Sequence, residues 1–243
     1  MKVYIQKDKQ NQYPSINFAA AFEGFRQMGW EICDFYHSKD IVDNEKENVV
    51  IGYIDDVKNV LQKFDIQLPS FNYPEELYSF LGRKIWKSTV NTIANEPKNW
   101  NIFIKPVKDT KKFTGVLVKS TKDLIGCGDQ NTDTEIWCSE PVNFLAEWRC
   151  FVRYGEIKDV RMYKGNWRLH FDYQIIEKAV KQFTSAPAGY AIDFGLTDKG
   201  ETLLIEVNDG YSIGAYGFFH LDYAKLLAAR WAELTNSIDY CNF

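Results

Sequence analysis

The sequence predicts a mixed α/β (α+β) protein in which a small open α/β unit precedes a larger part built on antiparallel sheets. Strand and helix patterns alternate over the first 64 residues in the order β-α-β-β-α, which is typical of an open sheet covered by helices. From residue 135 onward, strand patterns instead follow one another across short turns, as in antiparallel pairs. The chain has 243 residues, 45% hydrophobic and 16% aromatic, and can fill the core of one large domain or two small ones.

The N-terminal unit is predicted from its periodicity. Apolar runs indicate strands over 2–6, 31–36 and 49–54, and helical periodicity indicates helices over 16–29 and 55–64. Gly52 and the pair Asp55 and Asp56 mark a turn from strand into helix. The loops at the carboxyl ends of such strands are expected to form part of a cleft.

Residues 68–74 form a linker rich in turn-forming residues, and we place a domain boundary after it. The predicted domains are therefore 1–74, an N-terminal α/β domain, and 75–243. A helix predicted from residue 75 to about 94 would put Arg83 and Lys87 on one face. On spacing alone, this basic face fits a solvated surface as well as an anion site.

A lysine ends the next predicted strand, residues 100–106. Lys105 follows apolar residues and precedes Pro106, so its ammonium can face a cleft at a strand end. It is a candidate phosphate ligand, because a lysine in an apolar strand needs an anionic partner or a lowered pKa. The alternative is a lysine whose stem is buried while its charge reaches solvent. Residues 113–119 are predicted to be the hairpin partner.

Strands are then predicted over 135–142, 147–154 and 157–163, and helices over 172–185 and 221–236. Alternation along the second strand places Glu147, Arg149 and Arg153 on one face together with Phe151. We expect this face to be charged and the opposite face to pack. The charged face is either a ladder of cross-strand salt bridges or the wall of a polyphosphate site in which Glu147 orients an arginine.

Three oxygen-bearing side chains converge on the last predicted hairpin, strands 191–194 and 203–207. Asp193, Glu206 and Asn208 lie in or beside apolar strands, and a buried carboxylate must be paired or bound to a cation. Their oxygens suit Mg²⁺ or Mn²⁺. The alternative is ordinary turn chemistry at a polar hairpin end. The loop 208–217 that follows holds three glycines and two tyrosines, and could approach a substrate closely.

Composition excludes several classes of protein. The net charge of −4, with no run of more than two basic residues, argues against broad nucleic-acid binding. Five scattered cysteines lack zinc-site spacing and fit reduced thiols. Three distant histidines give little support to a histidine metal site or a serine hydrolase. Without a signal peptide or a long apolar stretch, we expect a cytoplasmic protein that does not enter the membrane.

The order of these motifs resembles the ATP-grasp superfamily. The basic segment, the Phe-Ile-Lys-Pro strand, a Glu-Pro-Val segment, the Glu-Trp-Arg-Cys-Phe-Val strand, and Asp-Phe-Gly followed by Ile-Glu-Val-Asn-Asp occur in that sequence over roughly residues 80–235. They are most similar to a divergent clade with two arginines and one lysine, known largely from bacterial and phage genomes. The resemblance implies an ATP-grasp fold, with a Rossmann-like pre-ATP-grasp unit and antiparallel sheets enclosing a nucleotide cleft.

The resemblance also implies roles for single residues. Lys105 matches the lysine that contacts the α- and β-phosphates, and Arg149 matches the arginine that meets the γ-phosphate or the acyl phosphate. The implied metal ligands are Asp193, Glu206 and Asn208. The remaining matches are Arg83 or Lys84 for the upstream basic residue, Glu140 with Val142 for the segment that receives adenine and ribose, and residues 111–115 for a shortened phosphate loop.

The implied activity is that of a ligase dependent on ATP and Mg²⁺ (or Mn²⁺), which joins a carboxylate to an amine or thiol through an acyl phosphate. The implied partners are ATP, a carboxylate-bearing small molecule, peptide or protein, and an amine acceptor, for which Tyr211 and Tyr216 are candidate contacts. A kinase-like phosphotransferase and a non-catalytic nucleotide-binding module are the alternatives, and the oligomeric state stays open.

Overall fold

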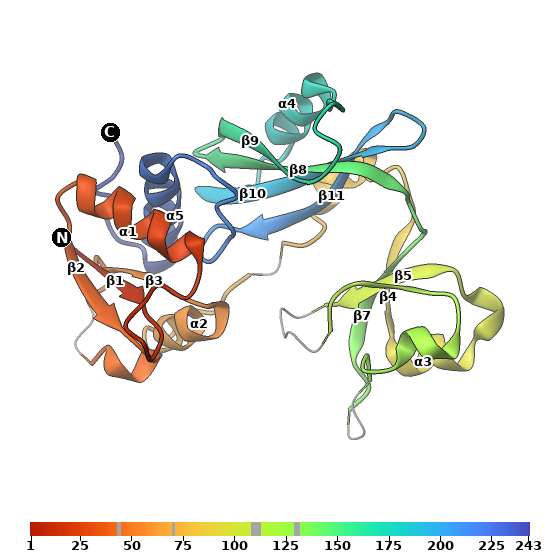
Figure 1. Cartoon of the computed structure of the whole chain (residues 1–243), viewed down its shortest axis with the longest axis horizontal. Coiled ribbons are helices and arrows are strands. Elements are labelled where there is room, and N and C mark those ends of the chain that lie inside the picture. Colours follow the sequence, from red (N-terminus) through yellow and green to blue (C-terminus); the bar gives the residue numbers. More distant parts are fainter. Residues whose placement is uncertain (43–44, 70, 108–112, 129–131) are drawn as a thin grey trace. The chain divides into compact units, whose positions relative to one another are not determined.

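A computed structural model describes residues 1–42, 45–69, 71–107, 113–128 and 132–243 (Figure 1). The chain forms two compact units: Met1–Phe80 joins Phe144–Phe243 in the first, and Leu81–Asn143 forms the second. These units divide the chain differently from the boundary after residue 74, which stays a prediction about domains. Within the described ranges, no helix combines the length and the apolar character that a membrane crossing needs. All five cysteines are free thiols.

The first unit begins with the predicted small α/β layer. A parallel sheet of order β2-β1-β3 is made by β1 (Lys2–Gln6), β2 (Glu31–Phe35) and β3 (Val49–Ile51), with α1 (Ile16–Gln27) and α2 (Ile54–Gln62) beside it. All three predicted strands and both predicted helices are confirmed to within a few residues. The side chains of Val3, Ile5, Phe25 and Leu61 are fully buried between these elements.

The larger part of the first unit is a four-stranded antiparallel sheet. Its order is β11-β10-β8-β9, formed by β8 (Phe144–Arg153), β9 (Glu156–Gly165), β10 (Gly189–Thr197) and β11 (Thr202–Asp209). The helix α4 (Tyr173–Gln182) adjoins one face, where Phe183 contacts the ring of Tyr190. On the other face Phe151 stacks on Phe218, in a core shared with α5 (His220–Thr235) and the N-terminal layer.

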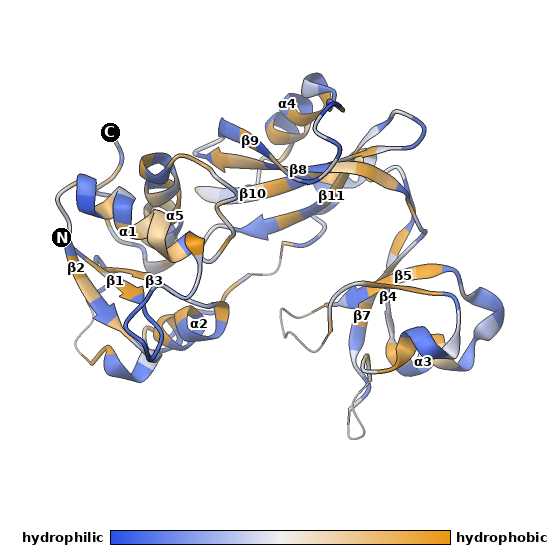
Figure 2. Ribbon diagram, in the orientation of Figure 1, coloured by the Kyte–Doolittle hydropathy of each residue, from blue (hydrophilic) through white to orange (hydrophobic). Residues whose placement is uncertain are grey.

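The two central strands are therefore buried on both faces, and Figure 2 shows hydrophobic residues along β8 and β10. Eight of the nine residues of β10 are buried. The expected division of β8 into a charged face and a packing face is wrong, because Phe151 shares its side of the strand with Arg149 and lies in the core. Both faces of β8 and β10 therefore bury side chains, and these include the charged residues Arg149 and Asp193.

The second unit is a sheet of order β4-β7-β5-β6. Its strands are β4 (Ile85–Thr89), β5 (Ile102–Pro106), β6 (Val116–Val118) and β7 (Glu135–Ser139), and α3 (Val90–Asn95) packs on one face. The predicted pairing of β5 with β6 is confirmed.

The long helix predicted over residues 75–94 is wrong. Residues Glu75–Phe80 form a 3₁₀ helix, Gly82 has a positive φ of 58°, and β4 follows. Aromatic and β-branched residues favour a strand here, and pairing with β7 overrides the helical periodicity. The α-helical part of this segment is the short α3, which begins at Val90 and is capped by Thr89, whose side chain accepts a hydrogen bond from the Thr92 amide.

Substitution of Gly24 tests the contact between α1 and α5. A Cβ atom at Gly24 would lie 2.2 Å from the carbonyl oxygen of His220 and 2.7 Å from the Cβ of Ala224. We expect Gly24→Ala to lower the free energy of unfolding by about 2 kcal/mol, because the clash outweighs the gain of up to about 1 kcal/mol in helix propensity. Urea and thermal unfolding measure the change. Gly128→Ala is the control, since among the described residues its Cβ would meet only Val90, at 3.8 Å. A Gly24→Ala protein as stable as the wild type would contradict this packing.

Candidate active site

The hairpin of β10 and β11 brings the three predicted metal ligands together. Asp193 lies opposite Glu206, and Asn208 lies two residues further along the same face. The amide nitrogen of Asn208 is 3.2 Å from Oδ2 of Asp193 and 3.4 Å from Oε1 of Glu206. The sequence-based expectation that these residues share one place is met by the geometry, and their role as metal ligands stays a prediction.

Arg149 joins this cluster from the neighbouring strand. It lies opposite Asp193, and its Nε and Nη2 atoms donate to the two carboxylate oxygens at 2.8 and 2.7 Å. Both side chains are buried, with 9% and 2% of their area exposed. Burial alone would lower the pKa of Arg149, but the charge of Asp193 and the hydrogen bonds to it raise that pKa overall. The guanidinium therefore stays charged.

Two of the three charged residues of β8, Glu147 and Arg149, form cross-strand ion pairs, as one of the two alternatives expected. Glu147 accepts from Lys164 of β9 at 2.5 Å, while Arg149 pairs with Asp193 of β10. The partner that orients Arg149 is therefore Asp193 and not Glu147. Because the Arg149 pair also adjoins Glu206 and Asn208, the ladder and an anion-binding wall are compatible here.

Two tyrosines cover the arginine. The ring of Tyr216 lies 4.9 Å from the Cζ atom of Arg149 and stacks on the ring of Tyr163 at 5.0 Å. Burial, followed by the charges of Asp193 and Glu147, raises the pKa of Tyr163, so its hydroxyl stays protonated. Tyr216 is thus half exposed beside Arg149, whereas Tyr211 is buried in the core, and an acceptor contact at either tyrosine stays a prediction.

Tyr163 was not found from the sequence. It is the extra residue of a β-bulge, because Met162 pairs with Trp148 and Lys164 pairs with Glu147. The alternating pattern of β9 carries no sign of this bulge. Tyr163 could have been suggested only by its position two residues beyond Arg161, which lies opposite Arg149.

The loop after β11 is fixed by the N-terminal layer. The Ser212 hydroxyl donates to the Gly52 carbonyl at 2.9 Å, and the Ala215 amide donates to the Asn17 side chain at 2.8 Å. A Cβ on Gly214 would lie 3.2 Å from the Tyr216 ring and 3.6 Å from Nη1 of Arg149. The glycine therefore permits the loop to lie close over the arginine.

The donor set fits a hard divalent cation. Two carboxylates and one amide side chain offer oxygen ligands of the kind that Mg²⁺ binds. The amide nitrogen of Asn208 now faces the carboxylates, and rotation of the amide by half a turn would present its oxygen instead. The described part of the chain holds no group of three or more His, Cys, Asp or Glu side chains that could hold a metal. Any metal here would therefore rely on the amide and on water as well as on the two acids.

The second unit carries Lys105 on a face of its own sheet. Lys105 of β5 and Lys87 of β4 both lie opposite Trp137 of β7, so the three side chains form a row across three strands. The ammonium of Lys87 lies 5.0 Å from the Trp137 ring. The opposite face, with Ile104 and Cys138, belongs to the core near α3. Lys87 therefore shares a sheet face with Lys105 and not a helix face with Arg83.

The other predicted nucleotide contacts lie near the ends of β4 and β7. The Lys84 amide donates to Oε2 of Glu140 at 2.9 Å, and the Glu140 amide donates to the Lys84 carbonyl at 3.1 Å. Arg83 donates to the Leu81 carbonyl. Glu140 and half-buried Val142 lie between β7 and β8. In the predicted phosphate loop, residues 111 and 112 lie outside the described residues, and their role stays a prediction together with those of Arg83, Lys84, Lys105, Glu140 and Val142.

Removal of the Asp193 carboxylate tests the buried ion pair. We expect Asp193→Ala to lower the free energy of unfolding by about 3 kcal/mol or more, because it leaves the Arg149 charge buried. Asp159→Ala, which breaks the more exposed Arg161 pair in the same sheet, should cost less than about 1 kcal/mol. Chemical denaturation measures both. Replacing both partners, as Arg149→Met with Asp193→Leu, should recover most of the loss. An equal loss in the free energy of unfolding for Asp193→Ala and Asp159→Ala would contradict the burial of the Arg149–Asp193 pair.

Comparison with known proteins assigns this chain to a family. Residues 80–226, more than half of the chain, match the family described as ATP-grasp domain, R2K clade family 2. Comparison with curated protein sequences gives no match.

Three solved structures illustrate the similarity of the fold. A D-alanine–D-alanine ligase from Bacillus anthracis has a TM-score of 0.59 at 11% identity, covering 97% of this chain and 98% of that one. The ATP-grasp ligase PsnB, complexed with a minimal precursor, has a TM-score of 0.53 at 12% identity, covering 94% and 99%. The macrocyclase MdnC from Microcystis aeruginosa MRC, bound with precursor peptide MdnA, has a TM-score of 0.53 at 11% identity, covering 93% and 99%.

The predicted fold class and the predicted clade are thus confirmed, and the family match with its ligase neighbours supports an ATP-dependent ligase. The chain belongs to the R2K clade, family 2, of ATP-grasp domain proteins.

Proposed function

We propose that this protein is an ATP- and Mg²⁺-dependent ligase that joins a carboxylate to an amine or thiol through an acyl phosphate. The observation that carries the proposal is the cluster of Arg149 with Asp193, Glu206 and Asn208, which combines a fixed cation with oxygen ligands for a metal. Membership of the ATP-grasp family supports ATP as the nucleotide.

The proposed reaction needs positioning and charge neutralisation rather than a protein nucleophile. An oxygen of the substrate carboxylate forms a bond to the γ-phosphorus of ATP, and the bond to ADP breaks. The acceptor amine then attacks the acyl carbon, loses a proton and displaces inorganic phosphate. When bound, Mg²⁺ would neutralise phosphate charge beside Asp193, Glu206 and Asn208.

The chain's own residues have separate tasks in this scheme. Asp193 holds the guanidinium of Arg149 in one orientation through two hydrogen bonds, so little reorganisation is needed when phosphate charge develops nearby. Lys105 supplies a second cation for the phosphates. Tyr216, 47% exposed beside Arg149, is where we place the acceptor contact.

A peptide or protein is the substrate class that we favour. Two structures of similar fold were solved with a precursor or precursor peptide, and each aligns over more than nine tenths of this chain. The alternatives are a kinase-like phosphotransferase and a non-catalytic nucleotide-binding module. Both would keep the nucleotide contacts, so products distinguish them. A cytoplasmic location stays a prediction of the sequence.

Product analysis tests the reaction type. The protein is incubated with Mg·ATP and a pool of amino acids and peptides, and ADP, free phosphate and new adducts are measured. A ligase gives ADP and free phosphate in equal amounts together with an amide or thioester. A phosphorylated product without free phosphate would indicate the kinase, and ATP binding without ADP would indicate the module.

Substitution of Glu206 tests the metal ligands independently of the substrate. We expect Glu206→Gln to weaken Mg·ATP binding roughly tenfold or more in calorimetry, because a neutral amide replaces a charged ligand. Glu201→Gln is the control, since Glu201 lies in the same hairpin and is exposed. Equal affinities for the two variants would remove Glu206 from the site.

Substitution of Lys105 tests the phosphate contact. Lys105→Ala should weaken ATP binding about tenfold while the melting temperature stays near that of the wild type. Lys98→Ala, at an exposed position of the same unit, should leave ATP binding unchanged. A large loss of stability with normal ATP affinity would instead make Lys105 a structural lysine.

A further inference from the structure

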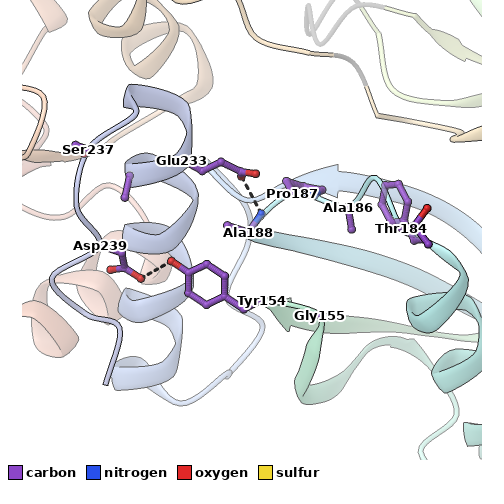
Figure 3. A pocket seen from close by; sticks show the side chains of 11 residues that line it. Tyr154, Gly155, Thr184, Ala186, Pro187, Ala188, Glu233, Ser237 and Asp239 are labelled. Atoms are coloured by element: carbon purple, nitrogen blue, oxygen red, sulfur yellow. Dashed lines mark hydrogen bonds between the residues drawn. The ribbon is translucent and has the colours of Figure 1, made fainter.

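A cavity lies within the first unit, and the Arg149 cluster does not line it. Its volume is about 580 Å³, within the range of small-molecule sites. Figure 3 shows its wall, formed by the β8–β9 turn at Tyr154, the segment before β10 at Pro187 and Ala188, and the α5 side at Glu233 and Asp239. Tyr154 is five residues along the chain from Arg149, or roughly 17 Å of extended strand.

The lining of this cavity is apolar and acidic. Phe183, Pro187, Ala188 and Ala232 supply apolar surface, and the cavity has two carboxylates. Among the described residues that line it there is no lysine, arginine or histidine. An apolar wall with acceptors and no lining cation favours a ligand that carries a positive charge on a hydrocarbon body.

Both oxygens of one of the two carboxylates already accept hydrogen bonds from the protein. Oδ2 of Asp239 accepts from Arg153 and from the Tyr154 hydroxyl, both at 2.9 Å, and Oδ1 accepts from the Cys241 amide at 2.8 Å. Burial and the bond to Asp239 raise the pKa of Tyr154 to about 12, so this hydroxyl remains the donor. Asp239 therefore shapes the cavity more than it offers a ligand contact.

The other carboxylate keeps an oxygen available. Oε2 of Glu233 accepts from the Ala188 amide at 2.8 Å and from Nη1 of Arg230 at 2.7 Å. Oε1 accepts no hydrogen bond from the residues that the structure describes, and the side chain is 41% exposed. The dashed line between Ala188 and Glu233 in Figure 3 is this bond, which holds the Glu233 carboxylate at the cavity wall.

The ion pairs behind the cavity are short of one positive charge. Arg153 pairs with Asp239, whereas Arg230 alone serves both Glu233 and Asp209. Two guanidinium groups thus face three carboxylates. Glu76 adds another acid nearby, since it accepts from the hydroxyl of Thr184 in the cavity wall.

We propose that this cavity is a binding site for an organic ammonium ion, whose charged group bonds to Oε1 of Glu233 while its hydrocarbon body lies on Phe183, Pro187 and Ala232. The ligand supplies the missing charge and covers the apolar wall. This site is separate from the proposed nucleotide site and does not depend on the proposed reaction.

The same arrangement links the cavity to the candidate active site. Arg230 donates to Asp209 through Nε and Nη2, each at 2.6 Å, and Asp209 directly follows Asn208 at the end of β11. An ammonium ion on Glu233 competes with Arg230 for that carboxylate and strengthens the bond of Arg230 to Asp209. Binding of a ligand in the cavity therefore changes the protection of the β11 backbone amides against hydrogen exchange.

Calorimetric titration of the full chain with phenethylammonium tests the site, and 2-phenylethanol is the matched neutral probe. We expect saturable binding of phenethylammonium only. Glu233→Gln should weaken it roughly tenfold or more, since a charged hydrogen bond is lost. Ala186→Phe, which fills the cavity without touching a charge, should abolish it. Glu177→Gln, an exposed acid on α4, should leave it unchanged.

Several results overturn the proposal. Absence of phenethylammonium binding up to about 10 mM, equal binding of the alcohol, or unchanged affinity in a folded Ala186→Phe protein each rules the site out. Circular dichroism identifies a variant that fails to fold. In that case the comparison of phenethylammonium with 2-phenylethanol on the wild-type protein still tests the site. Hydrogen exchange of residues 205–210 tests the link: binding that leaves these amides unchanged overturns the coupling through Arg230.

Discussion

The buried ion pair of Arg149 and Asp193 is the constraint around which the first unit is arranged. Burying two charges in the centre of a sheet costs several kcal/mol per ion unless both are neutralised and hydrogen-bonded. The two short, parallel hydrogen bonds meet that condition, but only when β8 and β10 keep the register that places the residues opposite each other. A slip of one strand by one residue would place Asp193 and Arg149 on opposite faces of the sheet. The pair thus fixes the register, and the register sets where Glu206, Asn208 and Tyr216 lie.

Much of the fold was predictable because its signals are local. Apolar runs and helical periodicity located the parallel layer and the strands from β7 to β11, since each of these segments buries a continuous set of side chains. The segment 75–94 could not be predicted in this way. Its periodicity is helical, but Gly82 interrupts it and Trp86 and Thr89 gain more by pairing with β7. Pairing partners distant in the chain decided this segment, and no local pattern reports them.

The candidate site was predictable to the extent that it depends on alternation within strands. Asp193, Glu206 and Asn208 come together because a tight hairpin must align them, and Arg149 was found because it lies on the charged face of a predicted strand and matches an arginine of the ATP-grasp pattern. The identity of its ion-pair partner was not predictable, since Glu147 and Asp193 were both available. Tyr163 was missed because a bulge changes its pairing. Lys87 was placed on the wrong type of element together with Arg83, because the strand that carries it was not recognised.

Charge balance also bears on which form of the nucleotide the proposed site can accept. Asp193 and Glu206 bring two negative charges, and Arg149 brings one positive charge, so the cluster by itself is anionic. Free ATP would be repelled by such a cluster, because little solvent screens charges at this depth. A divalent cation reverses the sign of the cluster, after which phosphate oxygens are attracted both to it and to Arg149. In the proposed reaction these two acids therefore favour the magnesium complex over free ATP, and Asp193 has two tasks. It must keep Arg149 oriented while it shares its remaining lone pairs with the metal, which a carboxylate can do because each oxygen accepts more than one bond.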